Sequence, residues 1–360
     1  MMRIFILVFV LIAAGLVFVS PSTFTILVHR SQDYWPTHGW REASPEDQGM
    51  DSVRLSQADS HIKTQLPNIQ SLLVIRHGYL VFERYYRGIR SDDLQLIQSA
   101  TKAFVSALVG IALKKGLLNS LDQPLAEFFP EYFSSNSDPK KEKVTLRHLL
   151  SMTTGFEWDS VFAADRCFNN PDTIECLIRQ PLSDTPGTKF NYNSAGPHLL
   201  SGILTKVTHK SALEFADSTL FGPLGIAQRA WPADPQGNNN GSFGMALIPR
   251  DMAKLGYLYL MKGVWDGKQL IGADYVQQST SLQNTGGFPE DTSYGFLWWL
   301  SSESGHAAYF AAGYGGQYIY VIPDLEMIVV ITSNSNIAPS QLRDHRQLIR
   351  DFVVPAVKEK

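Results

Sequence analysis

Strand-like runs lie near both ends of this 360-residue chain, and a long helical stretch separates them. The first two runs are joined by His77-Gly78, and glycine readily supplies the positive φ of a tight hairpin turn. Between roughly residues 103 and 290 the pattern is helical, with proline and glycine between the helices. We therefore expect an α+β domain over residues 51–360, in which helices and a mostly helical insertion flank an antiparallel sheet built from both chain ends. The strand-like runs cover residues 71–76, 79–86, 294–300, 309–322 and 327–333.

The N-terminal segment is far more apolar than the rest of the chain. Residues 4–19 form an unbroken apolar run behind Arg3, and a second apolar patch covers residues 24–28, which together give enough length to span a bilayer with some tilt. A removable signal peptide needs small residues just before its cleavage site, whereas Ala13-Ala14-Gly15 lies inside the run. We therefore favour an uncleaved transmembrane anchor over residues 1–28, followed by a linker over residues 29–50. The charge of Arg3 favours export, which would place the following domain in the periplasm or outside the cell.

Composition excludes several classes of function. The formal net charge is −3 and there is no basic run, which argues against non-specific binding of nucleic acid. Two cysteines cannot make a four-cysteine zinc site, and no two histidines lie within four residues of each other. The phosphate-binding and dinucleotide-binding glycine motifs and the GxSxG elbow of α/β-hydrolases are also missing. We expect no metal and no organic cofactor.

The two cysteines, Cys167 and Cys176, stand on either side of an Asn-Asn-Pro-Asp turn signal. A disulfide that closes this small loop is plausible if the domain is exported. Two unrelated buried thiols are the alternative.

Three SxxK motifs occur in the sequence, and one of them has an unusual context. Ser99-Ala100-Thr101-Lys102 stands where an extended segment enters an apolar helix, so Ser99 would lie at the positive end of that helix. Lys102 follows one turn later on the same face. A buried lysine loses its charge more easily and can then accept the proton of a serine hydroxyl. The alternative is a helix-capping serine beside a surface lysine. The other two motifs begin at Ser60 and Ser137.

Two further segments could contribute to the same chemistry. Tyr192, in Phe190-Asn191-Tyr192-Asn193-Ser194, could transfer protons if a neighbouring lysine lowered its pKa, although a tyrosine before a helix often serves only in packing. The segment 312–317 places three glycines within four positions of a strand-like run, which indicates either a close backbone approach or a bulge without function. A backbone N–H exposed by such an approach could complete an oxyanion hole with the N–H of Ser99.

The order and spacing of these segments resemble the serine β-lactamase and penicillin-binding protein superfamily. Within it, the chain is most similar to family VIII carboxylesterases, class C β-lactamases and 6-aminohexanoate-dimer hydrolases, and the resemblance runs over residues 40–357. It implies a β-lactamase-like fold, with Ser99 as nucleophile, Lys102 as its proton acceptor and Tyr192 as the partner that relays a proton to the leaving group. Supporting stretches of the resemblance are residues 146–155, 220–226, 249–256 and 294–299.

The resemblance also implies supporting roles. Ser194 would be the third residue of the tyrosine motif, and the oxyanion hole would be formed by the N–H groups of Ser99 and Tyr314. The glycines around Tyr314 that complete this strand are Gly313, Gly315 and Gly316.

One departure from the family pattern bears on the substrate. Where β-lactamases and D,D-peptidases have Lys-Thr-Gly, this chain has Gly313-Tyr314-Gly315 or, one residue earlier, Ala312-Gly313-Tyr314. The cation that binds a substrate carboxylate is missing in either register. We therefore expect a membrane-anchored serine hydrolase that acts on a small-molecule ester or amide. A β-lactamase or D,D-peptidase is one alternative, and a non-catalytic sensor of the penicillin-binding type is another.

Overall fold

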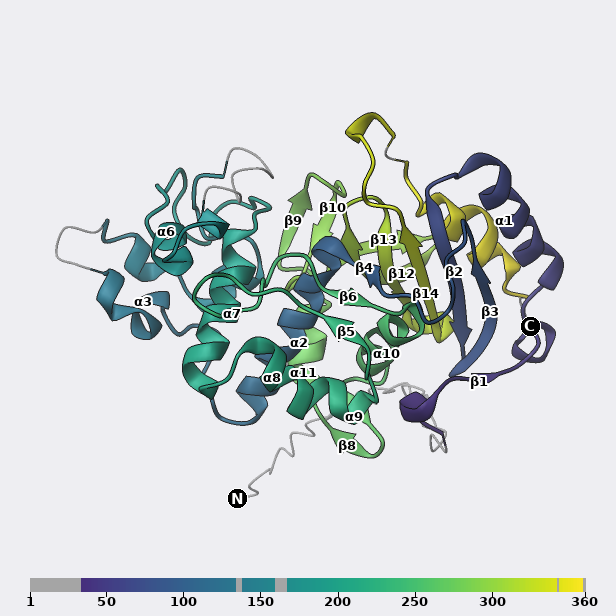
Figure 1. The fold of residues 1–360 in the computed structure, drawn as a ribbon, viewed down its shortest axis with the longest axis horizontal. Helices are drawn as coiled ribbons and strands as arrows, with labels where there is room; N and C mark the ends of the chain where they lie inside the picture. The colour runs from purple at the N-terminus through teal and green to yellow at the C-terminus, as the bar shows by residue number, and fades with distance from the viewer. Residues whose placement is uncertain (1–33, 134–137, 159–166, 342, 359–360) are drawn as a thin grey trace, which may run out of the picture. The chain divides into compact units, whose positions relative to one another are not determined.

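A nine-stranded sheet forms the centre of the computed structural model, which describes residues 34–133, 138–158, 167–341 and 343–358 (Figure 1). The strand order is β1-β3-β2-β14-β13-β12-β11-β10-β9, and only the β1–β3 pair is parallel. The two ends of the chain meet in the β2–β14 pair, where Val74 lies opposite Val329. The strands are β1 (Arg41–Glu42), β2 (Ile69–Arg76), β3 (Tyr79–Tyr85), β9 (Asn284–Gly287), β10 (Thr292–Tyr294), β11 (Trp299–Glu303), β12 (His306–Gly313), β13 (Gln317–Ile322) and β14 (Met327–Ser333). The predicted α+β arrangement, with a sheet built from both chain ends, is confirmed.

Helices make up most of the insertion between β3 and β9, as the sequence predicted, and two small sheets that it did not predict lie in the same insertion. The small sheets pair β4 (Gln95–Leu96) with β6 (Ala246–Leu247) and β5 (Arg229–Ala230), and β7 (Val264–Trp265) with β8 (Lys268–Gln269). The α-helices are α1 (Ser52–Gln65), α2 (Thr101–Lys114), α3 (Leu125–Phe128), α4 (Leu146–Leu150), α6 (Thr173–Ile178), α7 (Ala195–Thr208), α8 (Ala212–Ala216), α9 (Gly222–Leu224), α10 (Pro249–Leu260) and α11 (Ala273–Ser279). Shorter helical segments include η3 (Gln98–Ala100), η7 (Asp217–Phe221), η10 (Ile349–Val353) and η11 (Val354–Ala356).

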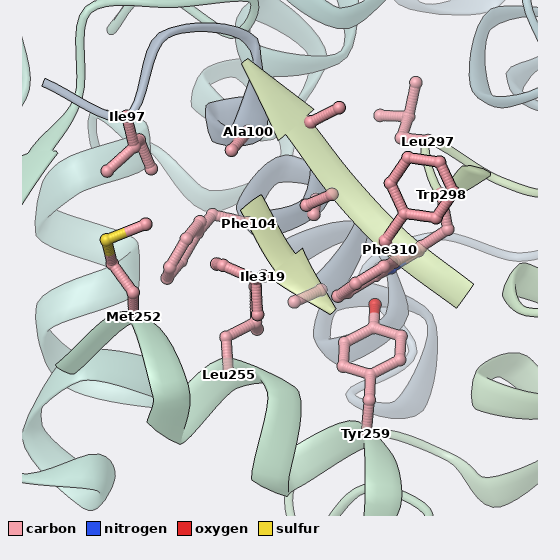
Figure 2. Packing of buried hydrophobic residues seen from close by; sticks show 14 of the residues in the cluster. Ile97, Ala100, Phe104, Met252, Leu255, Tyr259, Leu297, Trp298, Phe310 and Ile319 are labelled. Carbon is pink, nitrogen blue, oxygen red and sulfur yellow. The ribbon is translucent and has the colours of Figure 1, made fainter. Parts of the chain in front are cut away.

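The main core lies between helix α10 and the central strands. Gly256 allows the helix to approach closely, because a Cβ at this position would lie 3.0 Å from Ile328 and 3.2 Å from Ile319. Side chains of α10 point toward those of β12, β13 and α2 (Figure 2). The labelled members of this cluster, all buried, are Ile97, Ala100, Phe104, Met252, Leu255, Tyr259, Leu297, Trp298, Phe310 and Ile319. Because Ile97 lies two residues before residue 99 and Ala100 directly after it, the core anchors the turn that carries this serine.

The structure corrects the expectation of one glycine-interrupted strand over residues 309–322. This stretch forms two antiparallel strands, β12 and β13, in which Gly313 lies opposite Gln317. Gly315 and Gly316 have φ values of 88° and 96°, so they belong to the hairpin turn that joins the strands. Glycine favours such positive φ values because it has no Cβ, which is the physical reason for the break.

Residues 34–50, the described part of the predicted linker, pack as part of the folded domain. Residues from Tyr34 onward fall in one compact unit. Arg41 and Glu42 form the edge strand β1, and Trp40 is buried, with its indole N–H donating to the Arg250 carbonyl at 2.9 Å.

The predicted membrane anchor over residues 1–28 lies outside the described residues. Among the helices that the structure does describe, none is both long and apolar enough to cross a bilayer.

Cys167 and Cys176 are joined by a disulfide, so the first of the two alternatives for these cysteines holds.

Candidate active site

Ser99 lies in the η3 turn, directly before the buried helix α2. Helix α2 is labelled in Figure 1. Residues 101–112 of this helix are all buried, which explains its apolar sequence. The turn begins at Gln98, a non-glycine residue with a φ of 50°. Ser99 itself is half-buried. The fold thus presents the hydroxyl of Ser99 at the N-terminal end of a helix that is fixed in the core.

Lys102 is buried beside Ser99, with only 2% of its surface exposed. Its Nζ lies 3.0 Å from Ser99 Oγ and 2.9 Å from the carbonyl oxygen of Ser242. Burial disfavours the ammonium form and lowers the pKa of the Lys102 amine from 10.5 to about 7. A large fraction of this lysine is therefore neutral near pH 7, and a neutral amine can accept a proton from the serine hydroxyl.

The SxxK motif at Ser60 gives an internal comparison. Ser60 and Lys63 are both exposed on α1. Ser60 Oγ donates to the Ser56 carbonyl at 3.0 Å, and Lys63 Nζ pairs with Asp59 at 2.7 Å. The same sequence spacing on a solvated helix face therefore produces ordinary surface contacts. The third motif begins at Ser137, outside the described residues.

Tyr192 lies over Lys102, whose Nζ is 4.9 Å from the centre of the tyrosine ring. Trp299 packs on the same ring at 5.4 Å between centroids. Burial raises the pKa of the Tyr192 phenol above its ordinary value, and a side-chain hydrogen bond with Ser99 lowers it by a smaller amount. The expected lowering by the neighbouring lysine is not found, because burial of the phenol has the largest effect on its pKa. Tyr192 is therefore a neutral phenol at physiological pH.

The end of strand β12 packs against the turn that carries Ser99. A Cβ on Gly313 would lie 2.2 Å from the Ile97 carbonyl oxygen, so the residue at this point must be glycine. Ala311 shares a face of β12 with Gly313, because side chains alternate along a strand. Gly313 is therefore the glycine that packs against the turn carrying Ser99. The two residues before it are Ala311 and Ala312, and neither side chain is cationic.

The other predicted residues of this strand end lie in or beside the hairpin turn. Tyr314 is 42% exposed, and its hydroxyl donates to the Ile337 carbonyl at 3.0 Å. A Cβ on Gly315 would lie 2.8 Å from Ser335 Cα, and one on Gly316 would lie 2.0 Å from His345 Nδ1. Both glycines thus permit close packing of the turn. The role of the Tyr314 N–H as an oxyanion donor stays a prediction.

Ser194 contacts the residues around Lys102 through its backbone carbonyl. It precedes α7 without making a side-chain capping bond, and its carbonyl accepts the hydroxyl of Ser242 at 2.5 Å. Ser242 also holds Lys102 through its own carbonyl, and sequence reasoning missed this residue. The one available signal was the polar run Asn238-Asn239-Asn240, which directly precedes Gly241-Ser242.

Within the ranges that the structure covers, no group of three or more His, Cys, Asp or Glu residues could hold a metal ion.

Comparisons with known proteins give a match to one family model and several similar proteins. A family model described as Beta-lactamase matches residues 59–353. The 6-aminohexanoate-dimer hydrolase of Paenarthrobacter ureafaciens is 25% identical over 306 residues, which cover 76% of this chain and 76% of that protein. Esterase EstB of Burkholderia gladioli is 27% identical over 176 residues, which cover 43% of this chain and 44% of the esterase.

A class C beta-lactamase from Rhodobacter sphaeroides has a similar solved structure. The TM-score is 0.63 at 17% sequence identity, and the likeness covers 85% of this chain and 99% of that one. At this identity the likeness concerns the arrangement of helices and strands, and it carries no argument about chemistry.

Proposed function

The chain belongs to the beta-lactamase family, as its motifs predicted, and from this premise we propose that it is a serine hydrolase acting through an acyl-enzyme on Ser99. One contact supports the proposal above all others. The buried amine of Lys102, with its pKa lowered to about 7, lies 3.0 Å from the Ser99 hydroxyl. A serine hydroxyl is a weak nucleophile until a base removes its proton, and a neutral lysine at this distance is such a base.

Acylation starts from neutral Lys102. The amine accepts the hydroxyl proton as Ser99 Oγ attacks the carbonyl carbon of the substrate, and the negative charge moves to the carbonyl oxygen. The N–H groups of Ser99 and Tyr314 stabilise this oxyanion. When the intermediate collapses, the bond to the leaving group breaks, and Tyr192 gives that group a proton while accepting one from protonated Lys102. The positive charge of protonated Lys102, beside the phenol, favours this transfer.

Deacylation uses the same groups in the reverse sense. A water molecule attacks the acyl carbon and gives a proton to the Lys102–Tyr192 pair. The second tetrahedral intermediate then releases the acid, and the Ser99 oxygen recovers its proton. The net reaction is hydrolysis of one ester or amide bond, and the chain's own side chains supply every proton acceptor.

We propose an ester, or an amide without a carboxylate near the cleaved bond, as the substrate. Strand β12 contains no lysine or arginine, and Ala311 and Ala312 precede the glycine that meets the serine turn. Arg346 lies 5.5 Å from the Phe310 ring of that strand, but carboxylates at 3.1 and 3.6 Å already pair with its guanidinium. Two of the sequence relatives are named as a 6-aminohexanoate-dimer hydrolase and an esterase, and these names fit the proposed substrate class.

Hydrolysis of three chromogenic compounds and one peptide tests the reaction type and the substrate class. The full-length protein would be assayed with p-nitrophenyl butyrate, a neutral p-nitroanilide, a chromogenic cephalosporin and a D-alanyl-D-alanine peptide. We expect turnover of the ester or the anilide that is lost in Ser99→Ala. Turnover of the cephalosporin or the peptide alone would contradict the substrate class. Equal turnover in wild type and Ser99→Ala would contradict the mechanism.

We also propose that the domain is anchored by residues 1–28 and works outside the cytoplasm. The Cys167–Cys176 disulfide supports this location, because disulfides persist in oxidising compartments. An alkaline phosphatase fused after residue 50 is active only when exported. Phosphatase activity in the membrane fraction is therefore expected, and an inactive cytoplasmic fusion would contradict the proposal.

A further inference from the structure

His198 and Asp234 form a buried, hydrogen-bonded pair that the proposed reaction does not use. His198 Nε2 lies 2.9 Å from Asp234 Oδ2, and the two side chains are 0% and 1% exposed. His198 belongs to the first turns of α7, and Asp234 follows strand β5. A pair withdrawn so far from solvent needs further hydrogen bonds to offset the loss of hydration. Those further bonds lead from the pair to the active site.

Asp234 closes a tight turn in the segment after β5. Its Oδ1 accepts backbone N–H groups from Gln236 at 2.9 Å and from Asn238 at 2.8 Å. Its own N–H donates to the Asn238 carbonyl at 2.8 Å. One carboxylate therefore fixes the conformation of residues 234–238 and binds the His198 ring at the same time.

His198 connects this turn to the segment that follows it. Its Nδ1 accepts the backbone N–H of Gly241 at 3.3 Å, so its proton is on Nε2, which donates to Asp234. A Cβ on Gly241 would lie 2.0 Å from the Pro197 carbonyl oxygen. The backbone at Gly241 is therefore pressed against the start of α7, with the imidazole as its hydrogen-bond partner.

The next residue, Ser242, contacts the active site directly. Asn240 Oδ1 accepts the N–H groups of Ser242 at 2.9 Å and Phe243 at 3.1 Å. The Ser242 hydroxyl donates to the Ser194 carbonyl, and the Ser242 carbonyl accepts from Lys102 Nζ at 2.9 Å. An unbroken set of hydrogen bonds and chain neighbours therefore joins the His198–Asp234 pair to the amine.

The Ser242 carbonyl matters because a neutral amine has two N–H bonds and only one lone pair. When one hydrogen is donated to Ser242, rotation about the terminal C–N bond is restricted and the lone pair can face Ser99. We propose that His198 and Asp234 are positioning residues, which hold residues 238–243 so that the Ser242 carbonyl orients the Lys102 amine toward the Ser99 hydroxyl. The inference rests on the proposed function of Lys102 as the base.

Two substitutions at His198 in the full-length protein separate positioning from mere stability. His198→Leu removes both ring contacts, whereas the amide of His198→Gln can still accept from Gly241 and donate to Asp234. We expect His198→Leu to lower kcat by about 10- to 100-fold with KM within about twofold, because small misplacements of catalytic groups cost this much. The rate at which a fluorophosphonate labels Ser99 should fall by the same factor. His198→Gln should recover most of both rates.

Asp251→Asn is the matched control, because Asp251 also belongs to a buried polar pair, in which it lies 2.8 Å from Lys254 with 7% and 5% exposure. It should lower the melting temperature while leaving kcat and the labelling rate close to those of the wild type, in assays well below both melting temperatures. If His198→Leu does not fold, Ser242→Ala and Asp234→Asn replace it, with the same expected split between kcat and KM.

The positioning role would be overturned if His198→Leu kept the labelling rate and the kcat of the wild type. It would also be overturned if Asp251→Asn lost as much of both rates as His198→Leu. Failure of His198→Gln to recover activity while it restores the melting temperature would also contradict it. These outcomes differ from failure of the proposed function, in which the wild-type protein itself would show no turnover that depends on Ser99.

Discussion

The amine of Lys102 lies 3.0 Å from the hydroxyl of Ser99 and is only 2% exposed to solvent. At the exposed motif that begins at Ser60, by contrast, Lys63 forms an ion pair with the carboxylate of Asp59. The difference between the two motifs is burial, which changes the protonation state of the lysine and therefore the reactivity of its serine. Four predictions test the consequences of this arrangement.

The rate of acylation should depend on pH through the protonation of Lys102. Its pKa is lowered to about 7, and only the neutral amine, which predominates above that pH, can accept the serine proton. We expect kcat/KM for an ester to rise about tenfold per pH unit below pH 6 and to be half-maximal near pH 7. This pH dependence of kcat/KM is measured from initial rates, recorded at a wavelength where the absorbance does not depend on the ionisation of p-nitrophenol. A half-maximum near pH 10, or no rise at all, would contradict the assignment of Lys102 as the base.

Substitution of Lys102 by methionine should remove activity and stabilise the fold. In the unfolded chain the amine is protonated below 10.5, whereas in the fold it is neutral above about 7, so the wild type gains stability as pH rises between these values. At pH 7 this shift costs the wild type about 4 kcal/mol, partly offset by the hydrogen bond to Ser242. We expect Lys102→Met to raise the free energy of unfolding by about 2 kcal/mol and to lower kcat at least about 1000-fold.

Urea denaturation at pH 7 and pH 9.5 measures the stability change, which should be smaller at the higher pH. Lys63→Met, at the exposed motif, should change neither stability nor activity by much. A strong destabilisation by Lys102→Met at pH 7 would mean that the amine is charged and paired in the folded protein.

Removal of the Tyr192 hydroxyl should slow the reaction without disturbing the fold. Tyr192→Phe keeps the ring that packs on Trp299, so its melting temperature should stay close to that of the wild type. We expect kcat to fall by about 100- to 1000-fold, the usual contribution of a proton-transfer group. Tyr294→Phe, whose ring lies 6.4 Å from that of Tyr192, is the control and should remain active. Wild-type activity in Tyr192→Phe would remove the phenol from the mechanism.

A methyl group at Gly313 should separate strand β12 from the serine turn. The added Cβ would lie 2.2 Å from the Ile97 carbonyl, a backbone atom held in the core, so the strand or the turn must shift. We expect Gly313→Ala to lose about 1–3 kcal/mol of stability and most of its activity. Gly272→Ala, where the added Cβ meets nothing within 4 Å, should resemble the wild type in both measurements. Unchanged activity in Gly313→Ala would show that this approach is not needed for catalysis.

Local sequence patterns were sufficient to predict the parts of the fold and the site that depend on nearby residues. The hairpin at His77-Gly78 and the helix after Ser99 are of this kind, and both occur as expected. Ser99 and Lys102 belong to one short motif, so their contact follows from helix geometry. The run at residues 309–322 misled the prediction, because a glycine-rich hairpin turn between two buried strands resembles one interrupted strand.

The remaining features depend on contacts between residues far apart in the sequence. Ser242 is 140 residues from Lys102, and no local pattern marks a backbone carbonyl as a partner of a lysine. The direction of the Tyr192 pKa shift was expected wrongly, since the burial that raises it comes from the packing of distant strands and helices. His198 gave no signal of its own, because its role depends on where the segment after β5 returns to α7.

Mass spectrometry of the protein after treatment with a fluorophosphonate tests the central claim most directly. The full-length wild type would be labelled at neutral pH, digested and searched for the modified residue, with Ser60 as the internal comparison. We expect one phosphonyl group on Ser99, none on Ser60, and at least about a 100-fold slower reaction in Lys102→Met. Labelling of another serine, or equal labelling of Ser99 in the wild type and in Lys102→Met, would contradict the claim that the buried amine activates this nucleophile.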